Sequence, residues 1–133
     1  MIISNEQKKL FDTATKAIGF TYSPYSNFGV GAALLSENGE VITGNNIENA
    51  SYGLSMCAER VAVFKAVSEG HKNFSVIAIA SFPVSDCPPC GACLQVLNEF
   101  APDITIIYPD KSGEVVARKI FEMLPYSFEL NKE

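Results

Sequence analysis

Two short cysteine-containing segments lie on either side of a mostly apolar run, and this arrangement limits the folds that the chain can adopt. The first segment is Cys57-Ala58-Glu59-Arg60 and the second is Pro89-Cys90-Gly91-Ala92-Cys93. Apolar residues follow each segment, which predicts helices over residues 57–68 and 90–100. Residues 74–81 have the composition of a central strand that is covered on both faces. We therefore expect both cysteine segments at helix N-termini beside one sheet.

The remaining chain supplies one more helix and the other strands of the predicted sheet. Ser4 and Gln7 can form a capping box, which predicts a first helix over residues 5–18. Asn38-Gly39 is typical of a hairpin turn because both residues tolerate positive φ. Strands are expected around this turn and near the C-terminus, at residues 28–35, 41–46, 104–108 and 115–117. We expect an α/β fold of three layers, α/β/α, with a mixed sheet of about five strands.

Length and composition favour one globular domain over residues 1–133. Of the 133 residues, 47% are hydrophobic and 19% are charged, which excludes a disordered chain. The net charge is -5, and Lys and Arg do not cluster in the sequence. Binding to a nucleic-acid backbone needs clustered cations, so we expect no nucleic-acid partner and disfavour RNA or DNA editing.

The N-terminal sequence and the cysteines indicate where such a protein works. No basic region followed by an apolar segment opens the chain, so we expect no signal peptide. No stretch approaches the roughly twenty apolar residues that span a bilayer. Four cysteines without a secretion signal favour reduced thiols that serve a metal or catalysis. We expect a cytoplasmic protein that does not associate with membranes.

Three thiols and one carboxylate are the groups that a catalytic zinc site needs. Such a site has three protein ligands and keeps a fourth position open for water. Helix N-termini lower thiol pKa values, which favours Cys57, Cys90 and Cys93 as thiolate ligands of Zn²⁺. Glu59 leaves its helix in a different direction from Cys57, so it can reach the open position without binding the metal. We expect zinc-activated water to attack an aromatic C=N carbon with Glu59 as proton shuttle, and ammonia to leave.

The charge of this site needs compensation. Zn²⁺ with three thiolates carries a net charge of about -1, which opposes ionisation of the bound water. Arg60 follows Glu59 directly and is the candidate for electrostatic support.

The two cysteine segments, with Pro24-Tyr25-Ser26, residues 46–53 and Leu124-Pro125, resemble the small cytidine deaminases that have all-cysteine zinc sites. The resemblance extends over nearly the whole chain. It implies zinc ligands at Cys57, Cys90 and Cys93 and a proton shuttle at Glu59. It also implies a nucleoside substrate and a homotetramer whose active sites are completed by neighbouring subunits.

The same resemblance assigns the substrate contacts. It implies that Asn46 and Glu48 hydrogen-bond the ribose and that the backbone of Ala58 contacts the base. An aromatic ring at Phe28 would pack against the pyrimidine. Phe128 would reach the site of a neighbouring subunit.

Two positions depart from the family pattern. The family usually has arginine after the third ligand, where this chain has Leu94, so Arg60 is left as the arginine beside the motif. Cys87 is an extra thiol three residues before Cys90. It could be a substitute ligand or a redox-sensitive neighbour, and we favour an ordinary loop residue.

We therefore expect zinc-dependent hydrolysis of cytidine and deoxycytidine to uridine and deoxyuridine, for pyrimidine salvage. One alternative is a deaminase of a modified cytosine nucleoside such as blasticidin S, which Leu94 keeps open. Another is a zinc-stabilised binding protein without turnover. Two further interpretations of the motif remain. The cysteines could form a closed structural zinc site, with Cys87 as the fourth ligand. Alternatively, Cys57, Cys90 and Cys93 could be three buried core residues without a metal.

Overall fold

Five strands form one mixed sheet in the order β2-β1-β3-β4-β5. The computed structural model describes residues 3–132. β1 pairs antiparallel with both β2 and β3, β3 pairs parallel with β4, and β4 pairs antiparallel with β5. The predicted mixed, five-stranded sheet is confirmed. The strands span β1 Gly29–Ser36, β2 Val41–Asn45, β3 Phe74–Phe82, β4 Thr105–Pro109 and β5 Val115–Lys119.

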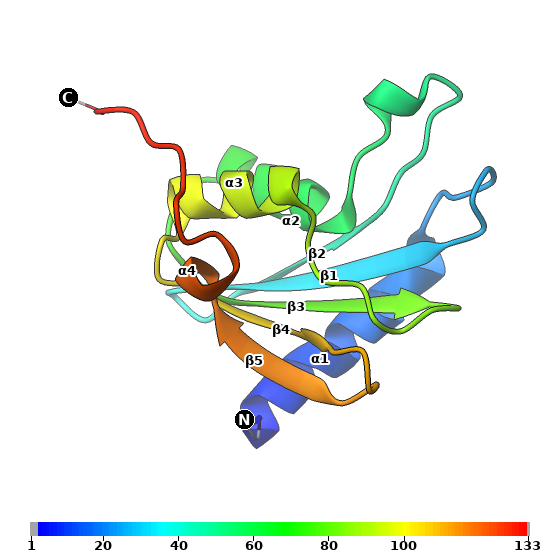
Figure 1. Cartoon of the computed structure of the whole chain (residues 1–133), viewed down its shortest axis with the longest axis horizontal. Coiled ribbons are helices and arrows are strands. Elements are labelled where there is room, and N and C mark those ends of the chain that lie inside the picture. Colours follow the sequence, from blue (N-terminus) through cyan, green and yellow to red (C-terminus); the bar gives the residue numbers. More distant parts are fainter. Residues whose placement is uncertain (1–2, 133) are drawn as a thin grey trace.

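Helices cover both faces of this sheet, so the predicted α/β/α layering is also confirmed (Figure 1). α1 (Asn5–Ala17) lies on one face, and α2 (Ala58–Ser68) and α3 (Gly91–Phe100) lie on the other. α4 (Ile120–Met123) is one short turn after β5, and two 3₁₀ turns occupy η1 (Ile18–Phe20) and η2 (Tyr52–Leu54). Among residues 3–132, no helix has the length and apolar character needed to cross a bilayer.

The first helix has the predicted capping box but ends one residue early. The Ser4 hydroxyl accepts from the Gln7 backbone N–H at 3.1 Å, and the Gln7 side chain accepts from the Ser4 backbone N–H at 2.9 Å. The chain then tightens into η1, where the Thr21 N–H donates to the Ile18 carbonyl. The predicted helix over residues 5–18 therefore stops at Ala17.

The hydrophobic core has two halves, one on each face of the sheet. Ile77 and Ile79 of β3 face α2 and α3, and Ala78 and Ala80 face α1. All four are at most 3% exposed. Successive side chains of a strand point to opposite faces, so this pattern is that of a strand buried on both sides. The prediction of a central strand at residues 74–81 is confirmed.

Candidate active site

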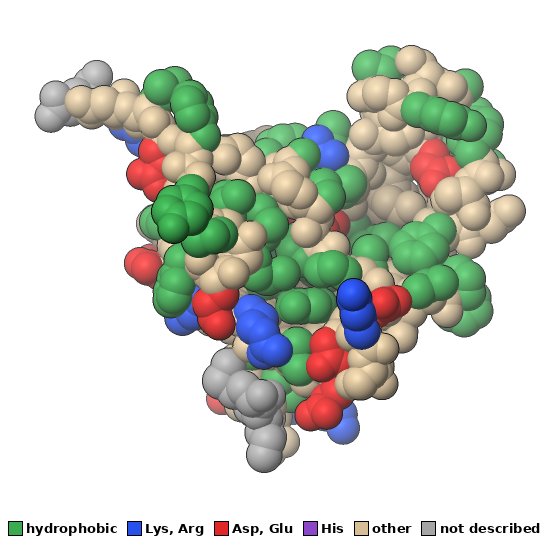
Figure 2. Space-filling view, in the orientation of Figure 1, with side chains coloured by type: hydrophobic (Ala, Val, Ile, Leu, Met, Phe, Trp, Pro, Cys, Tyr) green, Lys and Arg blue, Asp and Glu red, His purple; other side chains and the backbone are tan. Residues whose placement is uncertain are grey.

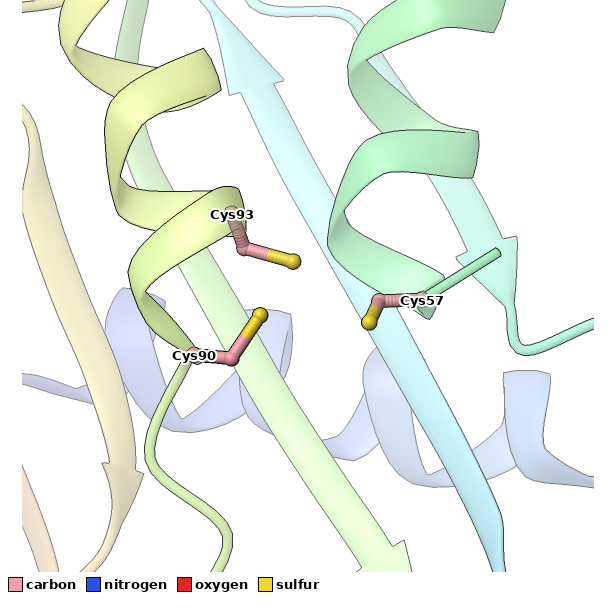
Figure 3. A group of neighbouring side chains, drawn as sticks. All are labelled: Cys57, Cys90 and Cys93. Carbon is pink, nitrogen blue, oxygen red and sulfur yellow. The ribbon is translucent and has the colours of Figure 1, made fainter. Parts of the chain in front are cut away.

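The three predicted zinc ligands meet where α2 and α3 begin. Cys57 is the N-cap residue of α2, Cys90 is the N-cap residue of α3, and Cys93 lies in the first turn of α3. Their Sγ atoms all lie within 4.8 Å of one another. Figure 3 shows the three thiols converging from the two helices. Both N-cap residues have extended backbone, so the helices begin at Ala58 and Gly91, one residue later than the sequence predicted.

A glycine in β2 allows α2 to approach the sheet closely. A Cβ atom added at Gly44 would lie 2.4 Å from the Ala58 carbonyl oxygen and 2.6 Å from the Ala62 backbone nitrogen. Real Cβ atoms do not come so near to backbone, so the first turn of α2 rests directly on the backbone of β2. Because Cys57 and Glu59 belong to this turn, Gly44 fixes their distance from the sheet.

The thiol cluster fits a zinc ion. Tetrahedral zinc with Zn–S bonds of about 2.3 Å places its sulfurs about 3.8 Å apart, within the spacing found here. Cys93 is buried, Cys57 is half-buried and Cys90 is exposed, so the cluster is closed on one side and open on the other. Cys87 does not belong to the group. This argues against a closed four-cysteine structural site.

Arg60 lies against the thiols, as the sequence led us to expect. Its Nη2 donates to Cys57 Sγ at 3.3 Å, and this bond raises the pKa of Arg60 further. A hydrogen bond from Cys93 and the Arg60 guanidinium lower the pKa of Cys57 to about 5, against the effect of burial. The pKa of Cys93 is raised, because it donates to Cys57 and is itself desolvated. The guanidinium of Arg60 therefore lies where the negative charge of the thiolates needs compensation.

Glu59 is a buried carboxyl group beside the cluster. It lies in the first turn of α2 and is 4% exposed. Burial, and secondly the charge of Cys57, raise the pKa of Glu59 to about 7. A group with such a pKa can accept and return a proton near neutral pH, as a general acid and base must.

A cavity of about 260 Å³ opens next to the thiols. Four predicted residues other than the ligands line it, namely Asn46, Glu48, Ala58 and Glu59. Cys57 and Cys90 also contribute to its wall, so the exposed side of the thiol cluster faces the cavity.

Asn46 lines this cavity, and most hydrogen-bonding positions of its side-chain amide are occupied by partners within the chain. Its Oδ1 accepts from the Val30 backbone N–H at 2.9 Å and from the Thr21 hydroxyl, and its Nδ2 donates to the Phe28 carbonyl at 2.8 Å. A carboxamide has two donor hydrogens and two acceptor positions. One N–H therefore stays available, and the bonds to the other three positions fix its direction.

Glu48 is held by the loop before β1. Its carboxylate accepts from the backbone N–H of Tyr25 at 3.0 Å, from that of Ser26 at 3.2 Å, and from the Ser26 hydroxyl. The Ser26 hydroxyl contributes most to lowering the pKa of Glu48. At neutral pH the group is an ionised acceptor at the cavity wall.

Two predicted aromatic residues do not line the cavity. Phe28 is half-buried and packs against the core on the α2 and α3 side of the sheet. Phe128 lies beyond α4 and is 68% exposed. Within one chain, the structure therefore brings together the polar part of the predicted site and leaves both rings outside the cavity wall.

The structure gives Cys87 a different place from the one expected and adds Pro88, which the sequence did not single out. Cys87, interpreted as an ordinary loop residue, lines the cavity together with Pro88. Burial, and then the charges of Glu59 and Cys57, raise the pKa of Cys87 to about 11, so its thiol stays protonated. Its place three residues before Cys90 was the available signal. Leu94, the departure from the family pattern, is 6% exposed and packs in the core.

Comparison with known proteins gives a consistent result. Residues 4–108 match the model of the cytidine and deoxycytidylate deaminase zinc-binding region. A cytidine deaminase of Halalkalibacterium halodurans is 46% identical over 124 residues, covering 92% of this chain and 94% of the relative. A blasticidin-S deaminase of Bacillus cereus is 31% identical, covering 97% of this chain and 96% of the relative.

Solved structures agree in fold. The crystal structure of cytidine deaminase from Burkholderia pseudomallei matches with a TM-score of 0.85 and 39% identity, covering 95% of this chain and all of that one. Cytidine deaminase from Mycobacterium tuberculosis matches with a TM-score of 0.84 and 37% identity, covering 96% of this chain and all of that one. The matches extend over nearly the full length and include both cysteine segments, and the chain belongs to the zinc-binding cytidine deaminase family.

Proposed function

We propose that this chain deaminates cytidine and deoxycytidine by hydrolysis to uridine and deoxyuridine, with release of ammonia, in pyrimidine salvage. The observation that carries the proposal is the meeting of three thiols with a buried carboxyl group, Glu59, on one cavity. Two relatives that are 46% and 41% identical to this chain are cytidine deaminases. We take residues 1–133 to act as one deaminase domain.

In this proposal Cys57, Cys90 and Cys93 bind zinc, and Arg60 offsets the charge of the thiolates. When bound, zinc supplies a Lewis acid that makes a water molecule nucleophilic near neutral pH. The chain's own task is then to move protons. Addition of water across the C4=N3 bond of cytosine moves one proton from water to the ring nitrogen, and loss of ammonia needs another on the amino group. Glu59 is the residue that transfers both protons, since it lines the cavity and has a pKa of about 7.

The ribose contacts follow from the two polar groups at the cavity wall. Glu48 offers a charged acceptor to a sugar hydroxyl, and Asn46 offers its remaining N–H. The negative charge of Glu48 would repel a nucleotide phosphate, which favours nucleosides. Ala58 lines the cavity at the start of α2, where backbone N–H groups have no partner within the helix. Phe28 does not line the cavity itself, but it lies two residues before the lining residue Val30, and we propose that its ring packs on the pyrimidine.

Phe128 leads to a proposal about assembly. Its ring is exposed and does not line the cavity of its own chain, so we propose that it completes the site of a neighbouring subunit in a homotetramer. Exposed aromatic residues at other places support such contacts, including Tyr52 at 78% and Phe82 at 69% exposure. Figure 2 shows hydrophobic side chains on the projecting C-terminal segment and on the loops at the opposite side.

The cysteines also bear on location. All four are free in the structure, and a site of three thiolates requires reduced cysteines. This supports the proposal that the enzyme works in the cytoplasm.

The test is ammonia release by purified, zinc-loaded protein. Cytidine and deoxycytidine should be turned over, while CMP and free cytosine should react poorly because they add a phosphate or lack the ribose. Glu59→Gln should lose turnover and keep its zinc. Blasticidin S as the sole substrate would move the protein to the other deaminase class, and zinc binding without any turnover would favour a binding protein.

A further inference from the structure

The C-terminal tail, residues 125–132, is held on α3 by hydrogen bonds from side chains of both segments. Gln95 Nε2 donates to the Phe128 carbonyl oxygen at 2.7 Å. Asn98 reaches the Glu129 carboxylate at 3.4 Å, and Lys132 donates to the Glu99 carbonyl at 3.0 Å. The tail contains no helix or strand, so these bonds, rather than a backbone ladder, define its path.

The Gln95 bond fixes the backbone of a residue that is itself mostly exposed. The backbone of Phe128 is anchored at 2.7 Å, yet the residue is 68% exposed. A further bond, from the Ser127 hydroxyl to Glu129 at 2.8 Å, restrains the residues on either side of it. A residue with a fixed backbone and an exposed ring is suited to contact another molecule.

The position of Gln95 in the chain connects this anchor with the zinc site. Cys90 is the N-cap residue of α3, Cys93 lies in its first turn, and Gln95 follows two residues after Cys93. The helix that carries two ligands of its own site thus also sets the ring position. We propose that Gln95 is a positioning residue, which holds Phe128 in place for the active site of a neighbouring copy of this chain. This inference rests on the proposed function of Phe128.

The expected effect is on substrate binding more than on chemistry. Without the Gln95 bond the tail backbone gains conformational freedom, and that freedom is lost again when Phe128 closes on a bound nucleoside. Gln95→Met keeps the side-chain length but removes the donor. Since one hydrogen bond contributes about 0.5–1.5 kcal/mol, we expect KM for cytidine to rise about three- to tenfold, with kcat changed less. Gln95→Glu, which places an acceptor against the carbonyl oxygen, should raise KM at least as much.

A double-mutant cycle separates positioning from a general structural role. If Gln95 acts through the ring, adding Gln95→Met to Phe128→Ala should cause no further loss in kcat/KM. Zinc content and urea unfolding of each variant check that the fold is retained. If the fold-losses in kcat/KM of the two single variants multiply in the double variant, the proposal is overturned, because Gln95 then acts independently of Phe128.

Mixed assemblies test whether the effect crosses between subunits. Glu59→Gln chains lack the proton shuttle but keep an intact tail. Refolded together with them, Gln95→Met chains should regain a low KM, as Phe128→Ala chains should. If the low KM returns for Phe128→Ala chains but not for Gln95→Met chains, the proposed role of Gln95 is overturned while that of Phe128 stands. No recovery of either would refute the neighbour's contact and this proposal with it. Failure of the proposed function would appear separately, as wild-type protein that releases no ammonia, and would also overturn the inference.

Discussion

Replacing Glu59 with Gln should make the metal-free protein more stable above pH 7 while it removes activity. Burial raises the pKa of Glu59 from its ordinary value of 4.5 to about 7. Folding therefore favours the protonated carboxyl group. The stability it contributes is present below pH 4.5 and is lost as the pH rises through about 7. The difference between these two pKa values corresponds to about 3 kcal/mol.

Glutamine has nearly the same shape but carries no charge at any pH, so it avoids this loss. Urea unfolding of chelator-treated, reduced protein at fixed chain concentration measures the effect. At pH 5, half a unit above the ordinary pKa, the Glu59→Gln variant should be the more stable by only about 1 kcal/mol. At pH 8 the variant should be more stable by about 3 kcal/mol. Equal stability at both pH values would refute the claim that the fold buries Glu59 at a cost in stability.

The same zinc-loaded variant should lose turnover by a factor of about 10² to 10⁴, the range of general acid–base catalysis. Retained turnover would show that another group moves the protons. The variant thus links two measurements with opposite signs, a gain in stability and a loss of activity, to one buried carboxyl group.

Three further substitutions test other parts of the site. Gly44→Ala should push the first turn of α2 off the sheet, which should lower the free energy of unfolding by about 1–3 kcal/mol and weaken zinc binding. Gly53→Ala is the matched control, because no atom lies within 4 Å of the Cβ that it adds. Arg60→Met should raise the pKa of Cys57, so zinc competition titrations should show a larger loss of affinity at pH 6 than at pH 8; an equal loss at both would refute the electrostatic role. Glu48→Gln should raise KM for cytidine by about tenfold with little change in kcat, and an unchanged KM would remove it from the ribose contacts.

Local sequence patterns were sufficient for the fold and for the thiol cluster. Helix starts at Cys57 and Cys90 and a doubly buried strand between them depend on residues close together in sequence, and the structure has both. Two helices that begin beside one sheet then bring their first residues together. That the three thiols form one site was predicted from the spacing of the cysteine motif, which matches a catalytic zinc site, together with the helix starts.

Contacts between distant segments could not be predicted in this way. The Asn46 amide is bonded to Thr21, Val30 and the Phe28 backbone, which depends on how the loop before β1 folds over β2. Cys87 lines the cavity beside Pro88, and its place three residues before Cys90 indicates that it is near the ligands but does not indicate which way its side chain points.

Titration of metal-free protein with zinc shows whether turnover depends on a metal ion held by the three thiols. Ammonia release from cytidine should be absent without metal, should rise in proportion to added zinc, and should level off at about one equivalent per chain, because Cys57, Cys90 and Cys93 form one site. Full turnover in the presence of a strong chelator, or no turnover once one equivalent is bound, would contradict the account.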